Sequence, residues 1–259
     1  MGMKMFSFSS SAMVNNPFDW AYQLEELGYT GWEVVNEGKQ KLTEETVSKI
    51  KDIVETTNLV ITIHLPYSDL NLASLNQPIW DETVRQMNTC LTLAGDFCDL
   101  AVVHPGHISP LGALMPDAAW SQNVLGIQEL CDHAEDLGIK VCVENMLSIP
   151  SMIGRRPEEM LGIIDTVDRE NVGFILDVGH ANTNGNVEDF LKIAGKVSHA
   201  HIHDNHGERD EHLPVGNGTV PWDKVAKAFQ GYQGRFVTEA RSLAEGERSL
   251  KRFKKLMNL

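Results

Sequence analysis

The sequence lacks the features of membrane, secreted and multidomain proteins. No stretch approaches about 18 consecutive apolar residues, so no membrane-spanning helix is expected. Residues 1–11 lack the charged start, apolar run and cleavage site of a secretory signal, and we therefore expect a cytoplasmic protein. No Pro-, Gly- or Ser-rich linker interrupts the composition, so residues 1–259 are predicted to form a single domain.

Cysteines and basic residues are both scarce. The cysteines show no Cys-x-x-Cys spacing and fall in segments that read as helix or buried strand, so we expect reduced core thiols at Cys90, Cys98, Cys131 and Cys142. The 22 Lys and Arg are outnumbered by 36 Asp and Glu, which gives a formal net charge of −14. This charge argues against broad attraction to nucleic acid or anionic membrane.

What the sequence does contain is a regular alternation of short apolar, β-branched runs with longer amphipathic segments. Repeated strand–helix units indicate a parallel sheet, and eight of them in about 250 residues favour a closed barrel. The predicted fold is α/β, a single (β/α)8 TIM barrel. The strands are expected at residues 5–9, 31–35, 59–64, 99–104, 140–144, 172–177, 197–204 and 235–239. The helices are expected at residues 17–27, from 44 onward, and at 78–94, 117–137, 157–167, 187–194, 221–229 and 246–259.

Imidazoles and carboxylates stand at the carboxyl ends of six consecutive predicted strands, where the active sites of such barrels lie. Burying these groups unpaired would cost several kcal/mol each, and the strand ends offer no comparable number of Lys or Arg. A divalent metal satisfies both donor types, with zinc or manganese favoured and one to three ions expected. The predicted ligands are His64, His104, Glu144, Asp177, His180, His201, Asp210, His212 and Glu239.

Six segments spread along the chain carry a resemblance to a known family. They are HLPYSDLNLAS from His64, VVHPG ending at Gly106, VENM from Val143, LDVGHAN from Leu176, HIHDNHGERDEHLPVGNGTVPW from His201 and TEAR from Thr238. Together they resemble the xylose isomerase-like TIM barrels, a superfamily of sugar phosphate isomerases and epimerases that also includes apurinic/apyrimidinic endonuclease IV. The resemblance covers essentially the whole chain.

This resemblance implies two sets of metal ligands. The ligands common to the isomerase and epimerase branch match Glu144, Asp177, His201 and Glu239. The extra ligands of the trinuclear zinc site of endonuclease IV match His64, His104, His180, Asp210 and His212. Because some isomerase-branch members also fill several of the extra positions, a full set leaves the chemistry open.

The preferred hypothesis is an isomerase or epimerase that acts on a small sugar or sugar phosphate. Glu144 and Glu239 would remove and return a proton through a metal-stabilised enediolate, with His180 as a further catalytic residue beside the substrate. The residues expected to contact the substrate are Arg241, Arg209 and Tyr67.

Two alternatives remain open at this point. A multi-zinc phosphodiesterase acting on abasic DNA would use the full ligand set, with Glu144 bridging two ions. Residues 64–78 and 104–117, which follow the proposed ligands, contain no Lys or Arg, so a nucleic-acid partner is not expected. The second alternative is a barrel that binds a metal or metabolite without turnover. No membrane partner is expected, and a homo-oligomer is left open.

Overall fold

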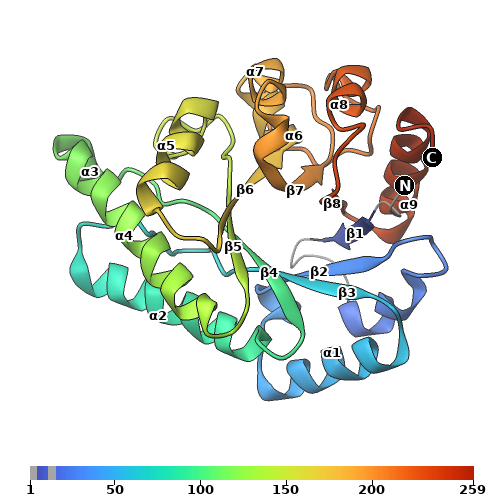
Figure 1. Cartoon of the computed structure of the whole chain (residues 1–259), viewed down its shortest axis with the longest axis horizontal. Coiled ribbons are helices and arrows are strands. Elements are labelled where there is room, and N and C mark those ends of the chain that lie inside the picture. Colours follow the sequence, from blue (N-terminus) through green and yellow to red (C-terminus); the bar gives the residue numbers. More distant parts are fainter. Residues whose placement is uncertain (1–4, 11–15) are drawn as a thin grey trace.

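Eight parallel strands close into a barrel in the computed structural model of this protein, which describes residues 5–10 and 16–259 (Figure 1). Neighbours in the sequence are neighbours in the barrel, and β8 pairs with β1 to close it. The strands are β1 (Met5–Ser9), β2 (Gly31–Val35), β3 (Val60–His64), β4 (Cys98–Val103), β5 (Lys140–Glu144), β6 (Val172–Asp177), β7 (Val197–Ile202) and β8 (Arg235–Glu239). The predicted fold is confirmed.

Helices surround the strands on the outside of the barrel (Figure 1). They are α1 (Glu44–Thr56), α2 (Gln77–Ala94), α3 (Pro110–Leu114), α4 (Pro116–Glu135), α5 (Pro157–Val167), α6 (Val178–Thr183), α7 (Val187–Leu191), α8 (Trp222–Ala228) and α9 (Leu243–Leu256). The start of α1 is fixed by a reciprocal cap, in which the Thr43 hydroxyl accepts from the Thr46 amide and the Thr43 amide donates to the Thr46 hydroxyl. None of the described helices is both long and apolar enough to cross a lipid bilayer.

The prediction of one helix over residues 17–27 is wrong. Two 3-10 helices stand there instead, η1 (Pro17–Asp19) and η2 (Ala21–Gln23). Phe18 and Trp20 both pack against Trp32. Their ring centroids lie 6.1 and 5.6 Å, respectively, from that of Trp32. Residues two apart lie on different sides of an α-helix, so both rings reach the core only if the chain leaves α-helical geometry.

Two short helices were not expected, because each is too short to show a helical period. They are α3 and α6, which lie in the loops at the carboxyl ends of β4 and β6. The Asp177 carboxylate at the end of β6 accepts a hydrogen bond from the His180 amide and so caps α6. This cap places the first turn of α6 at the mouth of the barrel.

Large apolar side chains fill the space between the barrel and its helices. Trp32, Phe6 and Phe253 are buried, and Phe6 stacks on Phe236 at 5.7 Å. All four cysteines are free and buried, as predicted. Burial raises the pKa of the Cys98, Cys131 and Cys142 thiols to about 12, so these residues stay protonated and act as small core side chains.

Candidate metal centre

The structure gathers all the predicted ligands at the carboxyl ends of the strands, where they form three neighbouring groups, two of which share Glu144. The first group is His64, His104 and Glu144, from β3, the loop after β4, and β5. The Nε2 atoms of the two imidazoles lie 3.4 and 3.2 Å from Oε2 of Glu144. His64 Nδ1 lies 2.9 Å from the Leu65 carbonyl oxygen. A carbonyl oxygen only accepts, so Nδ1 carries the proton and Nε2 is the nitrogen free to bind an ion.

The second group lies at the centre of the barrel mouth. Nδ1 of His201 on β7 lies 3.2 Å from Oε1 of Glu144, 3.7 Å from Oδ2 of Asp177 and 3.6 Å from Oε1 of Glu239. Glu144 thus belongs to both groups, with one oxygen facing each. His201 and Asp177 are fully buried, and Glu239 is nearly so.

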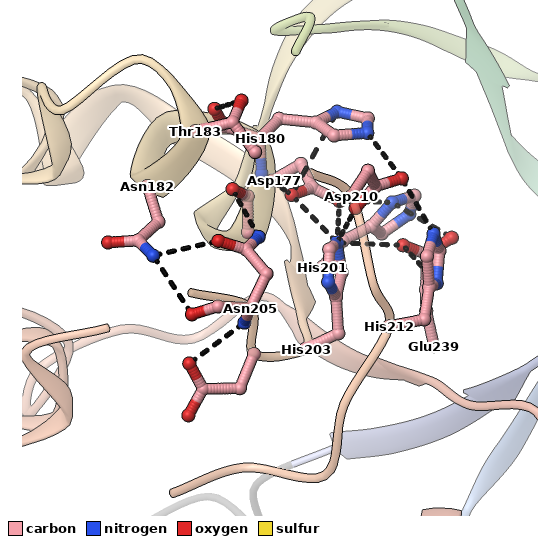
Figure 2. A network of polar contacts seen from close by, with 12 residues as sticks. Asp177, His180, Asn182, Thr183, His201, His203, Asn205, Asp210, His212 and Glu239 are labelled. Carbon is pink, nitrogen blue, oxygen red and sulfur yellow. Dashed lines mark hydrogen bonds and ion pairs between the residues drawn. The ribbon is translucent and has the colours of Figure 1, made fainter. Parts of the chain in front are cut away.

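The third group consists of His180 on α6 and of Asp210 and His212 in the loop that follows β7. Nε2 of His180 lies 3.5 Å from Oδ2 of Asp210, and Nε2 of His212 lies 2.9 Å from the same oxygen. His180 Nδ1 lies 2.9 Å from the Asn145 carbonyl oxygen, so Nε2 is the nitrogen free to bind. Figure 2 shows these side chains converging with those of the second group on one centre.

A tenth residue, His203, lies between the second and third groups and is not among the predicted ligands. Its Nε2 is 3.1 Å from both carboxylate oxygens of Asp177 and 3.6 Å from Oδ1 of Asp210. Its ring stacks on His212 at 4.2 Å (Figure 2). The signal was available, because alternate residues of a strand share one face and His203 continues the series of His199 and His201.

Gly179 makes the room for His203. A Cβ atom at position 179 would collide with the His203 imidazole ring. We expect Gly179→Ala to lower the free energy of unfolding by about 1–3 kcal/mol, the usual cost of overpacking, and to displace His203 from Asp177. Denaturant unfolding checks this, with Gly195→Ala as the control because nothing lies within 4 Å of a Cβ there. Equal stability of the two variants would contradict the packing described for Gly179.

The carboxylates and imidazoles of the centre compensate one another's charges. Burial opposes ionisation of Glu144 and Asp177, yet the surrounding histidines hold the pKa of both carboxyls below the usual range. In turn the carboxylates raise the pKa of the His180 and His201 imidazoles against the effect of burial, and that of His203 to about 9. In the part of the chain that the structure describes, no Lys or Arg forms an ion pair with any carboxylate of the three groups.

These donors fit divalent ions. Two atoms that each lie about 2.0–2.1 Å from one tetrahedral ion are about 3.3 Å apart, and the donor atoms described above lie mostly 3.1–3.7 Å apart. Oε2 of Glu144 and Oδ1 of Asp210 are buried and accept no hydrogen bond from the described residues. Buried oxygens without a partner next to imidazole nitrogens are the arrangement that a bound cation would satisfy.

A cavity of about 270 Å³ opens above the centre. Its volume is near the lower end of the range for small-molecule sites. None of the described residues that line it is Lys or Arg. The lining consists of Val35, His64, Tyr67, His104, Glu144, Met146, Leu147, Met152, His180, Asp210, His212 and Glu239.

The three residues expected to contact a substrate lie in different places. Tyr67 lines the cavity, and burial raises its pKa to about 12, so its hydroxyl remains a donor. Arg209 is exposed, and Arg241 forms an ion pair with Glu245 at 3.0 Å; neither lines the cavity. Their role in substrate binding stays a prediction.

Comparison with known proteins assigns the chain to one family. Residues 21–256 match the family described as xylose isomerase-like TIM barrel, and the chain belongs to it. It is similar to the uncharacterized protein MJ1311 of Methanocaldococcus jannaschii, with 31% identity over 97% of this chain and 90% of that protein. The solved structure of a D-tagatose 3-epimerase-like protein is 30% identical, with a TM-score of 0.90 over 99% of this chain and 98% of that one. A fructoselysine 3-epimerase of Escherichia coli O157:H7 is 22% identical over 93% of this chain and 94% of that protein.

Proposed function

We propose that this protein is a divalent-metal-dependent epimerase or isomerase that moves a proton at the carbon next to the carbonyl of a small sugar. The observation that carries the proposal is the placement of Glu144 and Glu239. They come from β5 and β8, line the same cavity, and lie 3.2 and 3.6 Å from the same nitrogen of His201. The similarity to a D-tagatose 3-epimerase-like protein and to a fructoselysine 3-epimerase supports a sugar as the substrate.

The two carboxyl groups are suited to opposite roles. Burial raises the pKa of Glu239, whereas the histidines around Glu144 outweigh its burial and hold its pKa low. A pair of carboxyls whose pKa values are driven apart supplies one base and one acid. Glu144, as the carboxylate, accepts the proton from the sugar carbon, and Glu239, as the acid, returns a proton to the opposite face of that carbon. His180 hydrogen-bonds an adjacent hydroxyl through Nε2.

The residues that would hold the divalent ion for this reaction are Glu144, Asp177, His201 and Glu239. When bound, the ion polarises the carbonyl and offsets the negative charge that develops as the proton leaves. Carboxylate and imidazole donors without thiolate suit zinc or manganese. The remaining groups, with His64, His104 and His212, offer places for one or two further ions.

The cavity favours an unphosphorylated sugar as the first substrate to test. A phosphate group is usually held by Arg, Lys or backbone amides, and the described lining offers neither of the two basic side chains. The lining instead combines the Tyr67 hydroxyl with the apolar side chains of Met146 and Met152. Such a surface accommodates hydroxyl groups on one side and the C–H face of a sugar on another.

A second candidate is a multi-zinc phosphodiesterase that cleaves abasic DNA. The observation that favours it is the completeness of the three donor groups and the sharing of Glu144 between two of them. The composition of the lining opposes it, because a DNA enzyme neutralises phosphates with Lys or Arg near its mouth.

Product analysis separates the two candidates. We expect protein loaded with manganese or zinc to convert at least one member of a panel of ketopentoses and ketohexoses into its epimer or isomer, measured by chromatography. The same preparation is expected to leave a duplex with one abasic site intact. Cleavage of that duplex without conversion of any sugar would favour the phosphodiesterase.

A further inference from the structure

A second polar cluster lies inside the barrel, beneath the metal centre. Its members are Glu33 on β2, Thr62 on β3, and His199 and His201 on β7, and all are fully buried. His199 Nε2 lies 2.8 Å from Oε2 of Glu33, and the Thr62 hydroxyl donates to the same oxygen at 3.3 Å. The other oxygen, Oε1, lies 3.1 Å from Nε2 of His201.

Among the residues that the structure describes, no Lys or Arg forms an ion pair with Glu33. Within residues 5–10 and 16–259, its ion pairs are with the two histidines alone. A carboxylate buried in this way destabilises the fold unless its partners are well placed, so a hydrophobic residue would serve packing better. Packing alone therefore does not account for a glutamate at position 33, and its effect on the neighbouring histidines has to be considered.

His201 connects Glu33 to the metal centre through its two ring nitrogens. Nε2 lies 3.1 Å from Oε1 of Glu33, and Nδ1 lies 3.2 Å from Oε1 of Glu144. Nε2 and Oε1 of Glu33 are both buried, and neither forms a regular hydrogen bond with any described residue, so each is left to the other. A neutral imidazole carries one proton, on one nitrogen or the other. When Nε2 carries it, towards the Glu33 carboxylate, Nδ1 offers its lone pair to an ion held by the carboxylates above.

We infer that Glu33 is a positioning residue of the metal centre: it accepts the Nε2 proton of His201 and so fixes the tautomer and ring orientation in which Nδ1 binds a divalent ion. The inference rests on the proposed metal centre and adds to it a residue that touches neither the ion nor the cavity. Carboxylates behind metal-binding histidines act in this way, and their removal typically costs 10–100-fold in metal affinity. His199 supports the arrangement by binding Oε2, which leaves Oε1 to His201.

The test is Glu33→Gln, which keeps the size of the side chain and removes its charge. We expect the zinc dissociation constant, measured by competition with a chromophoric chelator, to rise by about 10–100-fold. Glu45→Gln is the matched control, because it makes the same change at an exposed carboxylate of α1 that pairs with Lys49; its zinc affinity is expected to stay close to that of the wild type. Glu33→Asp, which keeps the charge but shortens the reach, is expected to fall between them and serves if the glutamine variant does not fold.

A second readout separates positioning from structural support. In zinc-saturated protein, NMR of the imidazole protons is expected to show the His201 Nε2 proton shifted far downfield and protected from exchange. In Glu33→Gln this signal is expected to move upfield, while the unfolding temperature of the metal-free protein changes little. Wild-type zinc affinity together with an unmoved Nε2 signal in Glu33→Gln would overturn the inference. A wild-type protein that binds no zinc would overturn the metal centre itself, which is a different failure.

Discussion

Glu144→Gln is expected to lower kcat for epimerisation by at least about 10³-fold. General acid–base groups typically contribute 10²–10⁴-fold, and Glu144 is in addition shared by two of the three donor groups. Glu239→Gln is expected to lower kcat by about 10²–10⁴-fold, because it removes the acid that returns the proton. Both effects are measured as initial rates at saturating metal.

The control for this pair is Glu211→Gln. Glu211 lies in the same loop as Asp210 but pairs with the exposed His206 at 2.8 Å, and it does not line the cavity. Its activity is expected to stay close to that of the wild type. If Glu144→Gln and Glu239→Gln both retained metal and catalysed the proton transfer at the wild-type rate, the two-carboxyl mechanism would be wrong.

Removal of divalent ions by a chelator is expected to abolish activity and to change the pH dependence of stability. In the metal-free protein, burial opposes the charge on His203, but Asp177 and Asp210 raise its pKa to about 9, above the ordinary value of about 6.5. A pKa that is higher in the folded state stabilises the fold below about pH 6.5, and this stabilisation is lost as the pH rises through about 9. The difference between these two pKa values corresponds to about 3 kcal/mol in the free energy of unfolding for one such group.

The stabilisation that the bound metal adds is expected to grow as the pH rises. Metal binding needs neutral imidazoles and so displaces their protons, which makes the ion a stronger stabiliser as the pH rises. The unfolding temperature of the chelated protein should therefore fall from about pH 6.5 to 9, while the gap between loaded and chelated protein widens. A chelated protein whose unfolding temperature rises across this interval would contradict the charge balance described for the centre.

The sequence predicted the barrel and the convergence of the ligands for a topological reason. In a closed parallel barrel the carboxyl ends of all strands meet at one rim, so residues far apart in the chain, such as His64 and Glu239, are brought together once the strands are placed. Arg241 lies just before α9 and pairs with Glu245 in the first turn of that helix. That this pairing holds the arginine outside the cavity lining could be seen only in the structure.

Other features depended on contacts that no local pattern reveals. Glu33 looks like a single polar residue in an apolar strand, and its partner His199 lies 166 residues away. His203 continues the alternation of His199 and His201, but the space in which its ring lies is left by Gly179, which the alternation does not reveal. The break in the helix predicted over residues 17–27 follows from the burial of Phe18 and Trp20 against Trp32, a tertiary contact that outweighs the local helical pattern.

Solvent deuterium incorporation tests the central claim most directly. A ketose incubated in D2O with the manganese- or zinc-loaded protein is expected to acquire deuterium at a carbon next to its carbonyl, at a rate that matches the appearance of the epimer or isomer in the NMR spectrum. Chelated protein and the Glu144→Gln variant are expected to show neither. Absence of deuterium incorporation into every ketose of the panel, with the metal bound, would contradict the proposed proton transfer at this centre.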